Sequence, residues 1–408
     1  MTPRDYPVFT VTPKAERSLR AGHPWVYGEE VTAVAGVYQN GDMVDVVSNK
    51  GRYLGTGWVN DHSKIRVRII SRNTNDVFDE AFFRRRVGYA LDYRKTVMGE
   101  TDYRCCRLIF GEADQFPGLT VDRFENILVT QVLSFGMEQR KDWVYRALVE
   151  LLQADGEEID AIYERNDVAI RALEGLEQGK GFYPMAGLKT DLNGHVIITE
   201  NGIKYDVDYI DGQKTGFFLD QKYNRLAAAK LARGRRVLDC FTHTGAFALN
   251  AAAAGAAHVT AVDVSAFALE LAAENGRKNG LTNLDYKCAD VFDLLTEMAK
   301  EKKCDYDYII LDPPAFTKSR ATAKNAYNGY KEINRKAMQL LPRGGYLATC
   351  SCSHFMTDEM FRKMLREAAA DAGVTLRQIE ARQQAPDHPI LPEVPETDYL
   401  KFYLLQVV

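Results

Sequence analysis

The carboxyl-terminal half of the chain alternates short apolar runs with helical stretches, and this alternation is the strongest constraint on its fold. The runs expected to be strands are Arg236–Asp239, His258–Asp263, Tyr286–Ala289, Tyr308–Leu311 and Tyr346–Cys350. Strands separated by helices pair in parallel, because each helix carries the chain back to the starting end of the sheet. The pattern predicts an α/β fold with a doubly wound, mostly parallel sheet.

Two further strand signals frame this half. Val196–Glu200 and Ile203–Val207 flank Asn201-Gly202, a residue pair that favours the tight type I′ turn of a hairpin. The tail from Tyr399 to Val408 is apolar and predicts one more strand, as an antiparallel edge of the sheet.

The residues before this half predict two smaller domains. Up to about residue 75, Gly and Asn residues separate three strand-like runs, at Met43–Val47, Tyr53–Val59 and Ile65–Ile70. This punctuation is typical of a small β-rich module. A helix over Phe82–Val97 and several strand-like runs follow, which predict a central α+β domain. We therefore expect domains at residues 1–75, 76–193 and 194–408.

Composition restricts the class of function. The chain has 408 residues and a net charge of −4, so any nucleic-acid surface must be a local patch. Seven cysteines, without a C-x-x-C pair, predict reduced thiols, a cytoplasmic protein and no zinc site. The start carries no apolar signal core, and no stretch is apolar enough to span a bilayer, so no membrane partner is expected.

One such patch is predicted in the β-rich module. Arg20, His23 and Trp25 interleave cations with an aromatic ring, and such side chains contact phosphates and stack on bases. Arg66 and Arg68 lie on one face of an expected strand. RNA contacts are predicted at these five positions. A basic helix end followed by a core Trp is the alternative interpretation.

Successive strands of the large sheet end in carboxylates. The first ends in Asp239, and its loop contains one glycine, Gly245, where a pyrophosphate site requires G-x-G-x-x-G. Asp239 repels phosphates and attracts an ammonium group. Asp263 at the next strand end suits ribose hydroxyls, and Asp290 at the third suits an adenine amino group. These residues predict a site for a nucleoside-like ligand with a cationic amino-acid portion. They argue against a nicotinamide dehydrogenase, which would bind a pyrophosphate here.

This arrangement resembles the class I S-adenosylmethionine-dependent methyltransferases over roughly residues 195–408. The resemblance implies a Rossmann-like, seven-stranded sheet and S-adenosyl-L-methionine as the cofactor. It extends the cofactor loop to Phe241 and Thr242. His243 departs from the family, in which Gly is common at this position.

Asp312-Pro313-Pro314-Ala315-Phe316 and the thiols of Cys350 and Cys352 bear on the atom that is methylated. Enzymes that methylate exocyclic amino groups use Asp/Asn-Pro-Pro followed directly by an aromatic residue, whereas here Ala315 stands between the second Pro and Phe316. C5 of a pyrimidine is a poor nucleophile, and a thiolate that adds at C6 makes C5 enamine-like. Asp312, when protonated, can hydrogen-bond to N3 of cytosine. Lys318, beyond this loop, is predicted to hold a neighbouring RNA phosphate.

The whole chain resembles the bacterial large-subunit (23S) ribosomal RNA cytosine-5 methyltransferases. The motifs that carry the resemblance are His23-Pro24-Trp25-Val26-Tyr27, Thr215–Gln221, Asp312–Phe316, Ser351-Cys352-Ser353 and Asp387-His388-Pro389. The resemblance implies an RNA-binding PUA module, a covalent nucleophile at Cys352, and ribosomal RNA as partner. It also implies that residues 217–225, Phe218 and Gln221 among them, border the cofactor, and Asp312 is predicted to contact the cofactor as well.

Two other functions stay open on the sequence alone. One is an exocyclic-amine RNA methyltransferase that uses Asp312-Pro313-Pro314, and the other is a non-catalytic RNA-binding factor of ribosome assembly. The sequence leaves open which cytosine is modified, whether free RNA or an assembled subunit is the substrate, which base removes the C5 proton, and whether the chain forms a homodimer.

Overall fold

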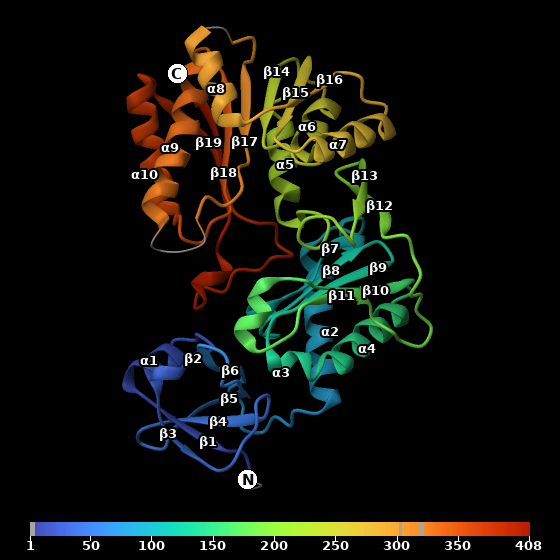
Figure 1. Ribbon diagram of the computed structural model, residues 1–408, viewed down its shortest axis with the longest axis vertical. Helices are drawn as coiled ribbons and strands as arrows, with labels where there is room; N and C mark the ends of the chain where they lie inside the picture. The colour runs from blue at the N-terminus through green and yellow to red at the C-terminus, as the bar shows by residue number, and fades with distance from the viewer. Residues whose placement is uncertain (1–4, 302–303, 318–321) are drawn as a thin grey trace. The chain divides into compact units, whose positions relative to one another are not determined.

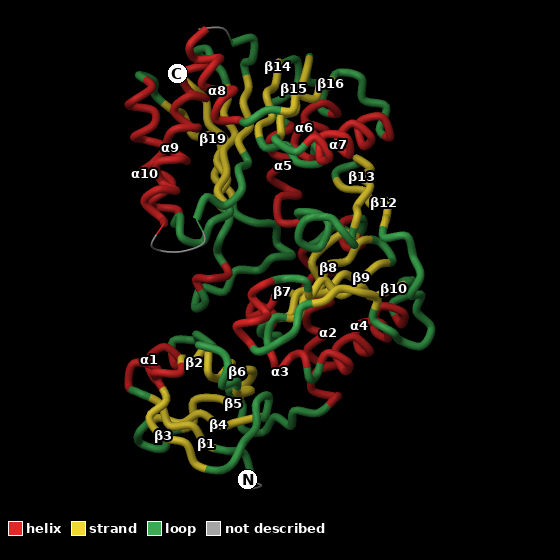
Figure 2. Tube along the Cα trace, in the orientation of Figure 1, coloured by secondary structure: helices red, strands yellow, loops and turns green. Residues whose placement is uncertain are grey.

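The computed structural model describes residues 5–301, 304–317 and 322–408 (Figure 1, Figure 2). They form two compact units. The first contains Met1–Ile198, Val207–Leu219 and Pro386–Thr397, and the second contains Thr199–Asp206, Asp220–Ala385 and Asp398–Val408. The first unit thus holds both smaller domains expected from the sequence. The three-part division at residues 75 and 193 stays a prediction.

The first unit contains a six-stranded sheet in the order β2-β6-β5-β4-β1-β3. Its strands are β1 (Val8–Val11), β2 (Trp25–Tyr27), β3 (Val31–Ala35), β4 (Met43–Ser48), β5 (Tyr53–Val59) and β6 (Ile65–Ser71). Helix α1 (Pro13–Arg20) begins where the Thr12 hydroxyl accepts the Ala15 N–H at 3.3 Å. The sequence predicted β4, β5 and β6, and it missed the three shorter strands, whose signals are weak.

A second sheet of the same unit has the order β11-β10-β9-β8-β7. Its strands are β7 (Cys105–Phe110), β8 (Leu119–Phe124), β9 (Ile127–Val132), β10 (Ala161–Asn166) and β11 (Gly179–Phe182). Its helices are α2 (Glu80–Val97), α3 (Phe135–Glu138) and α4 (Lys141–Ala154). Helix α2 starts at Asp79, whose carboxylate accepts the Phe82 N–H at 2.9 Å. This mixture matches the predicted α+β domain.

The second unit is built on a seven-stranded sheet in the order β16-β15-β14-β17-β18-β20-β19. Its strands are β14 (Arg236–Cys240), β15 (His258–Asp263), β16 (Leu284–Cys288), β17 (Tyr308–Leu311), β18 (Tyr346–Ser351), β19 (Leu376–Arg382) and β20 (Lys401–Val407). The strands from β14 to β18 are parallel, and β20 is antiparallel to both neighbours. The predicted doubly wound, mostly parallel sheet is confirmed.

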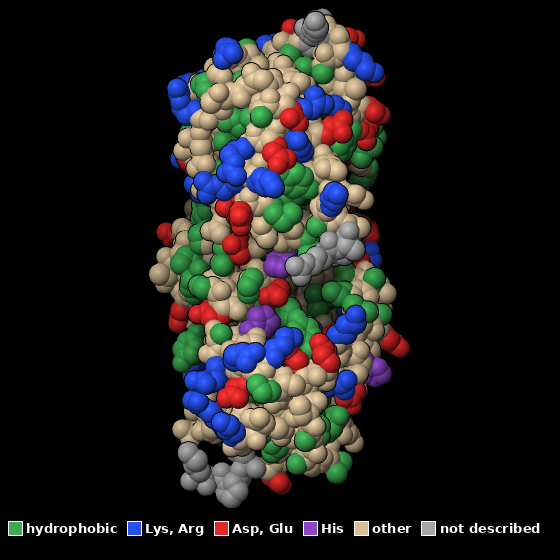
Figure 3. Space-filling model, turned by 90° about the vertical axis from the view of Figure 1, so that its left-hand side faces the viewer, with side chains coloured by type: hydrophobic (Ala, Val, Ile, Leu, Met, Phe, Trp, Pro, Cys, Tyr) green, Lys and Arg blue, Asp and Glu red, His purple; other side chains and the backbone are tan. Residues whose placement is uncertain are grey.

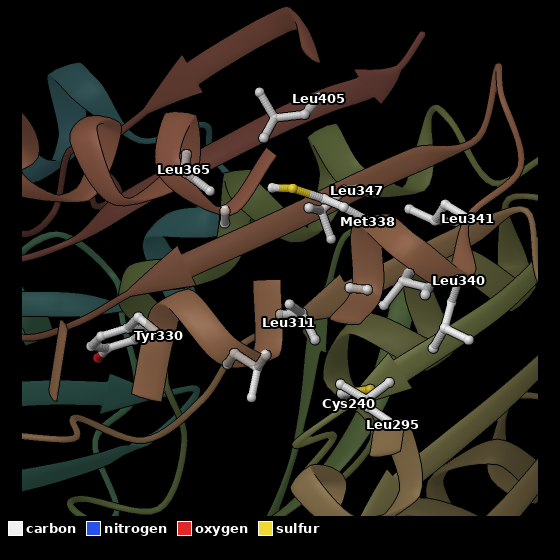
Figure 4. Close-up of a cluster of buried hydrophobic side chains, with 14 of the residues drawn as sticks. Cys240, Leu295, Leu311, Tyr330, Met338, Leu340, Leu341, Leu347, Leu365 and Leu405 are labelled. Carbon is white, nitrogen blue, oxygen red and sulfur yellow. The ribbon is translucent and has the colours of Figure 1, made fainter. Parts of the chain in front are cut away.

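Helices cover both faces of this sheet (Figure 1). They are α5 (Lys222–Ala229), α6 (Ala246–Ala253), α7 (Ala266–Lys278), α8 (Val291–Glu301), α9 (Ala323–Leu340) and α10 (Asp358–Ala372). Residues of α8, α9 and α10 pack on one face, in a cluster that includes Leu311, Tyr330 and Leu347 (Figure 4). Residues of α5 and α6 pack on the other face. None of the helices in the described ranges is long and apolar enough to cross a membrane.

Two strand expectations have definite outcomes. The hairpin of β12 (His195–Glu200) and β13 (Ile203–Asp208) is present, and Asn201 and Gly202 take positive φ values of 54° and 79° as a type I′ turn requires. The tail strand β20 is antiparallel as expected, but it is not the edge. Strand β19 pairs outside it and was missed, because its sequence, Leu-Arg-Gln-Ile-Glu-Ala-Arg, is largely polar.

Candidate active site at the carboxyl edge of the parallel sheet

The predicted site residues lie at the carboxyl ends of the parallel strands of the second unit or in the loops directly after them. Following the strand order, these are Asp290, Asp263, Asp239, Asp312 and Cys352. The order of strands reverses between β14 and β17, and open α/β sheets bind ligands at such a reversal. Asp239 and Asp312 come from these two strands, so they mark the centre of the candidate site.

Asp239 has the environment of a cation-binding carboxylate. It is fully buried, and its Oδ2 accepts a hydrogen bond from the Thr242 hydroxyl at 2.6 Å. Its Oδ1 has no hydrogen-bond partner within the described ranges. Burial raises the pKa of Asp239 to about 7. A buried carboxylate oxygen without a donor fits the ammonium group of S-adenosyl-L-methionine, which would supply the missing partner.

The loop after β14 has an unusual backbone. Phe241, His243 and Gly245 all have positive φ values, of 63°, 52° and 86°. Residues with side chains are strained in this region, and such strain gathers at functional sites. The positive φ at His243 explains why Gly is common there in the resembled family. At Gly245, a Cβ would lie 3.0 Å from the Cβ of Ala272, so the close packing of α6 on α7 requires glycine.

The other two acids at this edge hold backbone N–H groups. Asp263 accepts hydrogen bonds from the N–H groups of His243 and Ser265, both at 2.9 Å. Asp290 accepts from the N–H of Phe292 at 2.8 Å and lies at the start of α8. Each carboxylate oxygen has a second lone pair, so these bonds leave room for ribose or adenine. Their cofactor contacts stay predictions.

Asp312 lies in a chain of side-chain hydrogen bonds. Gln221 donates its Nε2–H to Asp312 at 3.0 Å, and Asn224 donates to the Gln221 oxygen at 2.7 Å. Burial, followed by the nearby charge of Asp220, raises the pKa of Asp312 to about 6. Gln221 thus fixes the orientation of Asp312, and the carboxyl group is poised between its two protonation states near neutral pH.

The two thiols at the end of β18, Cys350 within the strand and Cys352 directly after it, differ in exposure. Cys350 is fully buried in the core cluster of α5 and α6, and burial, followed by the charge of Asp312, raises its thiol pKa well above the ordinary value. Strand β18 ends at Ser351, and Cys352 follows it with a partly exposed side chain. Thiolates are the nucleophilic form, so the environment of Cys350 suppresses reactivity.

The aromatic ring of the Asp-Pro-Pro loop is partly buried against other aromatic rings. The Phe316 ring lies 4.5 Å from that of Tyr330 and 5.7 Å from that of Phe292, measured between centroids. A Cβ at Gly329 of α9 would lie 3.3 Å from the Phe316 ring, so the ring packs closely on this helix. The face of this ring toward Tyr330 is therefore occupied by a protein side chain.

Residues predicted to bind RNA or to border the cofactor also occur in the first unit. Arg20 is exposed, at the end of α1. The Trp25 indole N–H donates to Glu112 at 3.0 Å, with the His23 ring 5.2 Å away. The Lys214 ammonium lies 4.4 Å from the centre of the Phe218 ring.

The remaining predicted RNA contacts differ among themselves. Arg66 is partly exposed and pairs with Asp61. Arg68 departs from the expectation of a surface cation, because it is 9% exposed and pairs with Glu112 and Glu174 at 3.3 and 2.8 Å. It joins the β-rich module to two segments of the same unit, one between β7 and β8 and one between β10 and β11. Lys318 lies outside the described residues.

Sequence reasoning missed one residue beside Cys352. Lys401 opens β20 and is 4% exposed. The signal was available, since a lysine stands directly before the apolar run Phe402-Tyr403-Leu404-Leu405. A lysine in a buried strand is rare unless it is paired.

Comparison with known protein families places two segments of the chain. Residues 9–72 match the PUA-like domain, and residues 188–405 match the S-adenosylmethionine-dependent methyltransferases. The chain is 43% identical to "Ribosomal RNA large subunit methyltransferase I" of Shewanella denitrificans, over 97% of this chain and 98% of that protein. It is 38% identical to the protein of the same name from Klebsiella pneumoniae, over the full length of both.

Solved structures share the fold. A Streptococcus mutans protein assigned to the SAM-dependent methyltransferases superposes with a TM-score of 0.81 at 23% identity, covering 98% of this chain and 100% of that one. A protein assigned as a methyltransferase and complexed with SAH superposes with a TM-score of 0.82 at 22% identity, with the same coverage.

Proposed function

The chain belongs to the S-adenosylmethionine-dependent methyltransferases, within the ribosomal RNA large subunit methyltransferase I family, and we propose that it methylates C5 of a cytosine in large-subunit ribosomal RNA. The observation that carries the proposal is a partly exposed thiol, Cys352, at the sheet edge that bears Asp239 and Asp312. S-adenosyl-L-methionine supplies an electrophilic methyl group.

Each residue of the site has a part in the proposed reaction. The Cys352 thiolate adds to C6 of the cytosine, and the electron pair displaced from the C5–C6 double bond makes C5 nucleophilic. Protonated Asp312 donates a hydrogen bond to N3 and withdraws electron density from the ring. After C5 takes the methyl group, a base removes the C5 proton, the double bond forms again and the Cys352 thiolate leaves. Asp239 holds the cofactor ammonium throughout.

Methylation of an exocyclic amine is the less favoured reaction. It needs an aromatic ring that stacks on the flipped base beside Asp-Pro-Pro. Phe316, the aromatic residue of this loop, does not directly follow the second Pro, and its partly exposed ring packs on Tyr330 and Phe292. An amine methyltransferase would also have no use for a thiol at Cys352.

The reaction class can be tested with large-subunit ribosomal RNA that carries tritium at cytosine C5. Methylation at C5 releases tritium to water in step with methyl incorporation, and nucleoside mass spectrometry then yields 5-methylcytidine. Methyl incorporation without tritium release would identify an amine methyltransferase. RNA binding without methyl incorporation, with no binding of S-adenosyl-L-methionine, would favour an assembly factor.

RNA contact is proposed through Arg20, His23, Trp25 and Arg66 of the PUA-like module, and through Lys318. Figure 3 shows basic and acidic side chains interspersed over the face that it draws, in keeping with the net charge of −4. Such a surface favours a few specific phosphate contacts over a broad basic patch.

Two arginines of this module should respond differently to substitution. Arg20→Ala should weaken RNA binding about threefold and lower the slope of log K against log salt by about 1, because one phosphate contact is lost. Arg68→Gln should leave RNA binding by the folded protein unchanged but reduce the free energy of unfolding by about 3 kcal/mol, because Glu112 and Glu174 lose their partner. Filter binding and urea unfolding measure the two effects. An Arg20 variant with unchanged affinity and slope would remove Arg20 from the RNA contacts.

Cofactor affinity should depend on pH through Asp239. Its pKa is raised to about 7, so below this pH the carboxyl group holds a proton that the cofactor ammonium must displace. Affinity for S-adenosyl-L-methionine should therefore rise with pH between 5.5 and 7, approaching about tenfold per pH unit at the acid end. Calorimetric titration measures this slope.

Two variants control the assignment. Asp239→Asn should bind weakly at all these pH values and show no slope. Thr242→Val removes the hydrogen bond that favours the Asp239 carboxylate, which raises the pKa of Asp239 further. In this variant, cofactor affinity should therefore keep rising to a higher pH. Equal slopes in the unsubstituted protein and Asp239→Asn would show that another group governs the pH dependence.

A further inference from the structure

Lys401 has a buried ammonium group beside the proposed nucleophile. Its Nζ donates to the backbone oxygens of Ser353 at 2.6 Å and Tyr399 at 2.8 Å. In the antiparallel pairing of β18 with β20, Lys401 stands opposite Ser351. The backbone of Lys401 thus lies opposite Ser351, and its ammonium group contacts Ser353, so the side chain reaches both neighbours of Cys352. This geometry carries its charge along the segment that contains the thiol.

The ammonium group has a donor left over. An ammonium has three N–H donors, and two of them are used by the backbone oxygens. Within the described ranges, the third has no acceptor and no carboxylate pairs with Lys401. Burying a charge is costly, so anionic groups are expected near it, and the charges of Asp398, Cys352 and Asp358 act on Lys401 in this order.

Among the described residues, the following charged and titratable groups act on Lys401 and Cys352. Lys401 faces Asp398, Cys352 and Asp358, and burial lowers its pKa to about 8, against the opposing effect of these three groups. The Asp358 carboxylate accepts a hydrogen bond from Tyr403. Cys352 faces Lys401 of β20, Tyr330 of α9 and Cys350 of β18. Tyr330 and Cys350 stay neutral near pH 7, because burial raises the pKa of each.

We infer that Lys401 is a positioning residue whose ammonium group stabilises the Cys352 thiolate, which attacks the cytosine. The thiol loses its proton to water, the electron pair stays on Sγ, and Lys401 stays protonated. The inference deepens the proposed function and rests on it for the fate of the thiolate. A nearby opposite charge favours the charged form of a thiol, as it does in reactive cysteines of other enzymes.

The test is the pH dependence of alkylation of Cys352 by iodoacetamide, read by peptide mass spectrometry without RNA or cofactor. The thiol of the unsubstituted protein should titrate well below the ordinary value of about 8.5. Lys401→Met should raise this midpoint by about one pH unit or more and slow alkylation at pH 7 about tenfold. Lys401→Arg, which keeps the charge, should restore most of the shift. Cys288, exposed at the end of β16, is the internal reference and should not change.

Several outcomes would overturn the inference. One is an ordinary Cys352 midpoint in the unsubstituted protein, which can be measured even if Lys401→Met fails to fold. Another is an equal midpoint in folded Lys401→Met. A third is a Lys401→Met variant that forms the RNA adduct at the normal rate and accumulates it, because Lys401 would then be the base that removes the C5 proton.

The readout separates this inference from the proposed function. Thiol titration does not require methyl transfer. If Cys352 titrates low and depends on Lys401, while Cys352→Ala still methylates RNA, the covalent mechanism is wrong and the ion pair stands. If Cys352 is essential for methyl transfer but the midpoint of its thiol titration is the same in Lys401→Met, only the inference about Lys401 is wrong.

Discussion

Cys352→Ala is expected to lower the rate of methyl transfer at least about 10³-fold, which corresponds to about 4 kcal/mol of barrier. The loss follows because no other residue of the proposed mechanism can make C5 of cytosine nucleophilic. Single-turnover transfer from labelled S-adenosyl-L-methionine to large-subunit ribosomal RNA measures it. Affinity for the cofactor should stay within about twofold, since Cys352 is not among the proposed cofactor contacts.

Cys350→Ala is the matched control, because it removes a second thiol two residues away. Cys350 is fully buried, packs in the core and interacts with Asp312, so its loss should cost about 1 kcal/mol of stability and lower the transfer rate at most about tenfold, far less than the loss of Cys352. Equal losses in the two variants, or retained transfer in Cys352→Ala, would contradict the assignment of the nucleophile.

Trapping of the adduct gives an independent measurement. RNA with 5-fluorocytosine at the target site has no C5 proton to lose, so the bond between Cys352 and C6 persists after methyl transfer. The unsubstituted protein and Cys350→Ala should form a complex that survives denaturing electrophoresis. Cys352→Ala should form none.

The sheet and its acidic strand ends were predictable from local patterns. Parallel strands place their carboxyl ends at one edge, so finding where each strand stops was enough to bring Asp239, Asp263 and Asp312 together. The same logic placed Cys352, since β18 ends one residue before it. These predictions depend only on short segments, because the spacing of apolar residues within a segment predicts whether it forms a strand or a helix.

Contacts between distant segments were not predictable in this way. Arg68 alternates with apolar residues as a surface strand residue does, yet its partner Glu174 lies 106 residues away. Lys401 sits on β20, which lies inside the sheet only because the polar strand β19 covers it. Such burial depends on which strand pairs outside another, and no local pattern carries that information.

Asp312→Asn is expected to lower turnover about 10²-fold while changing cofactor affinity less than about threefold. The proposed role requires a proton that Asp312 donates to N3 of cytosine, and an Asn side chain donates a weaker hydrogen bond. Steady-state kinetics at saturating cofactor, together with calorimetric titration, measure the two quantities. Equal losses in turnover and affinity would indicate that Asp312 acts only on the cofactor.

The pH dependence of the reaction gives the sharper test of the same residue. The pKa of Asp312 is raised to about 6, so the protonated form is lost as pH rises through this value, and turnover limited by it should fall. Gln221→Met removes the hydrogen bond that favours the carboxylate, so the fall should move to higher pH, and in Asp312→Asn it should vanish. The free energy of unfolding should change with pH in the same direction as turnover. The folded state binds more protons than the unfolded state between about pH 4 and 6, so Asp312 makes stability decrease as pH rises through this window. Asp312→Asn should make that decrease smaller in urea unfolding and leave the part due to Asp239, whatever the RNA substrate proves to be.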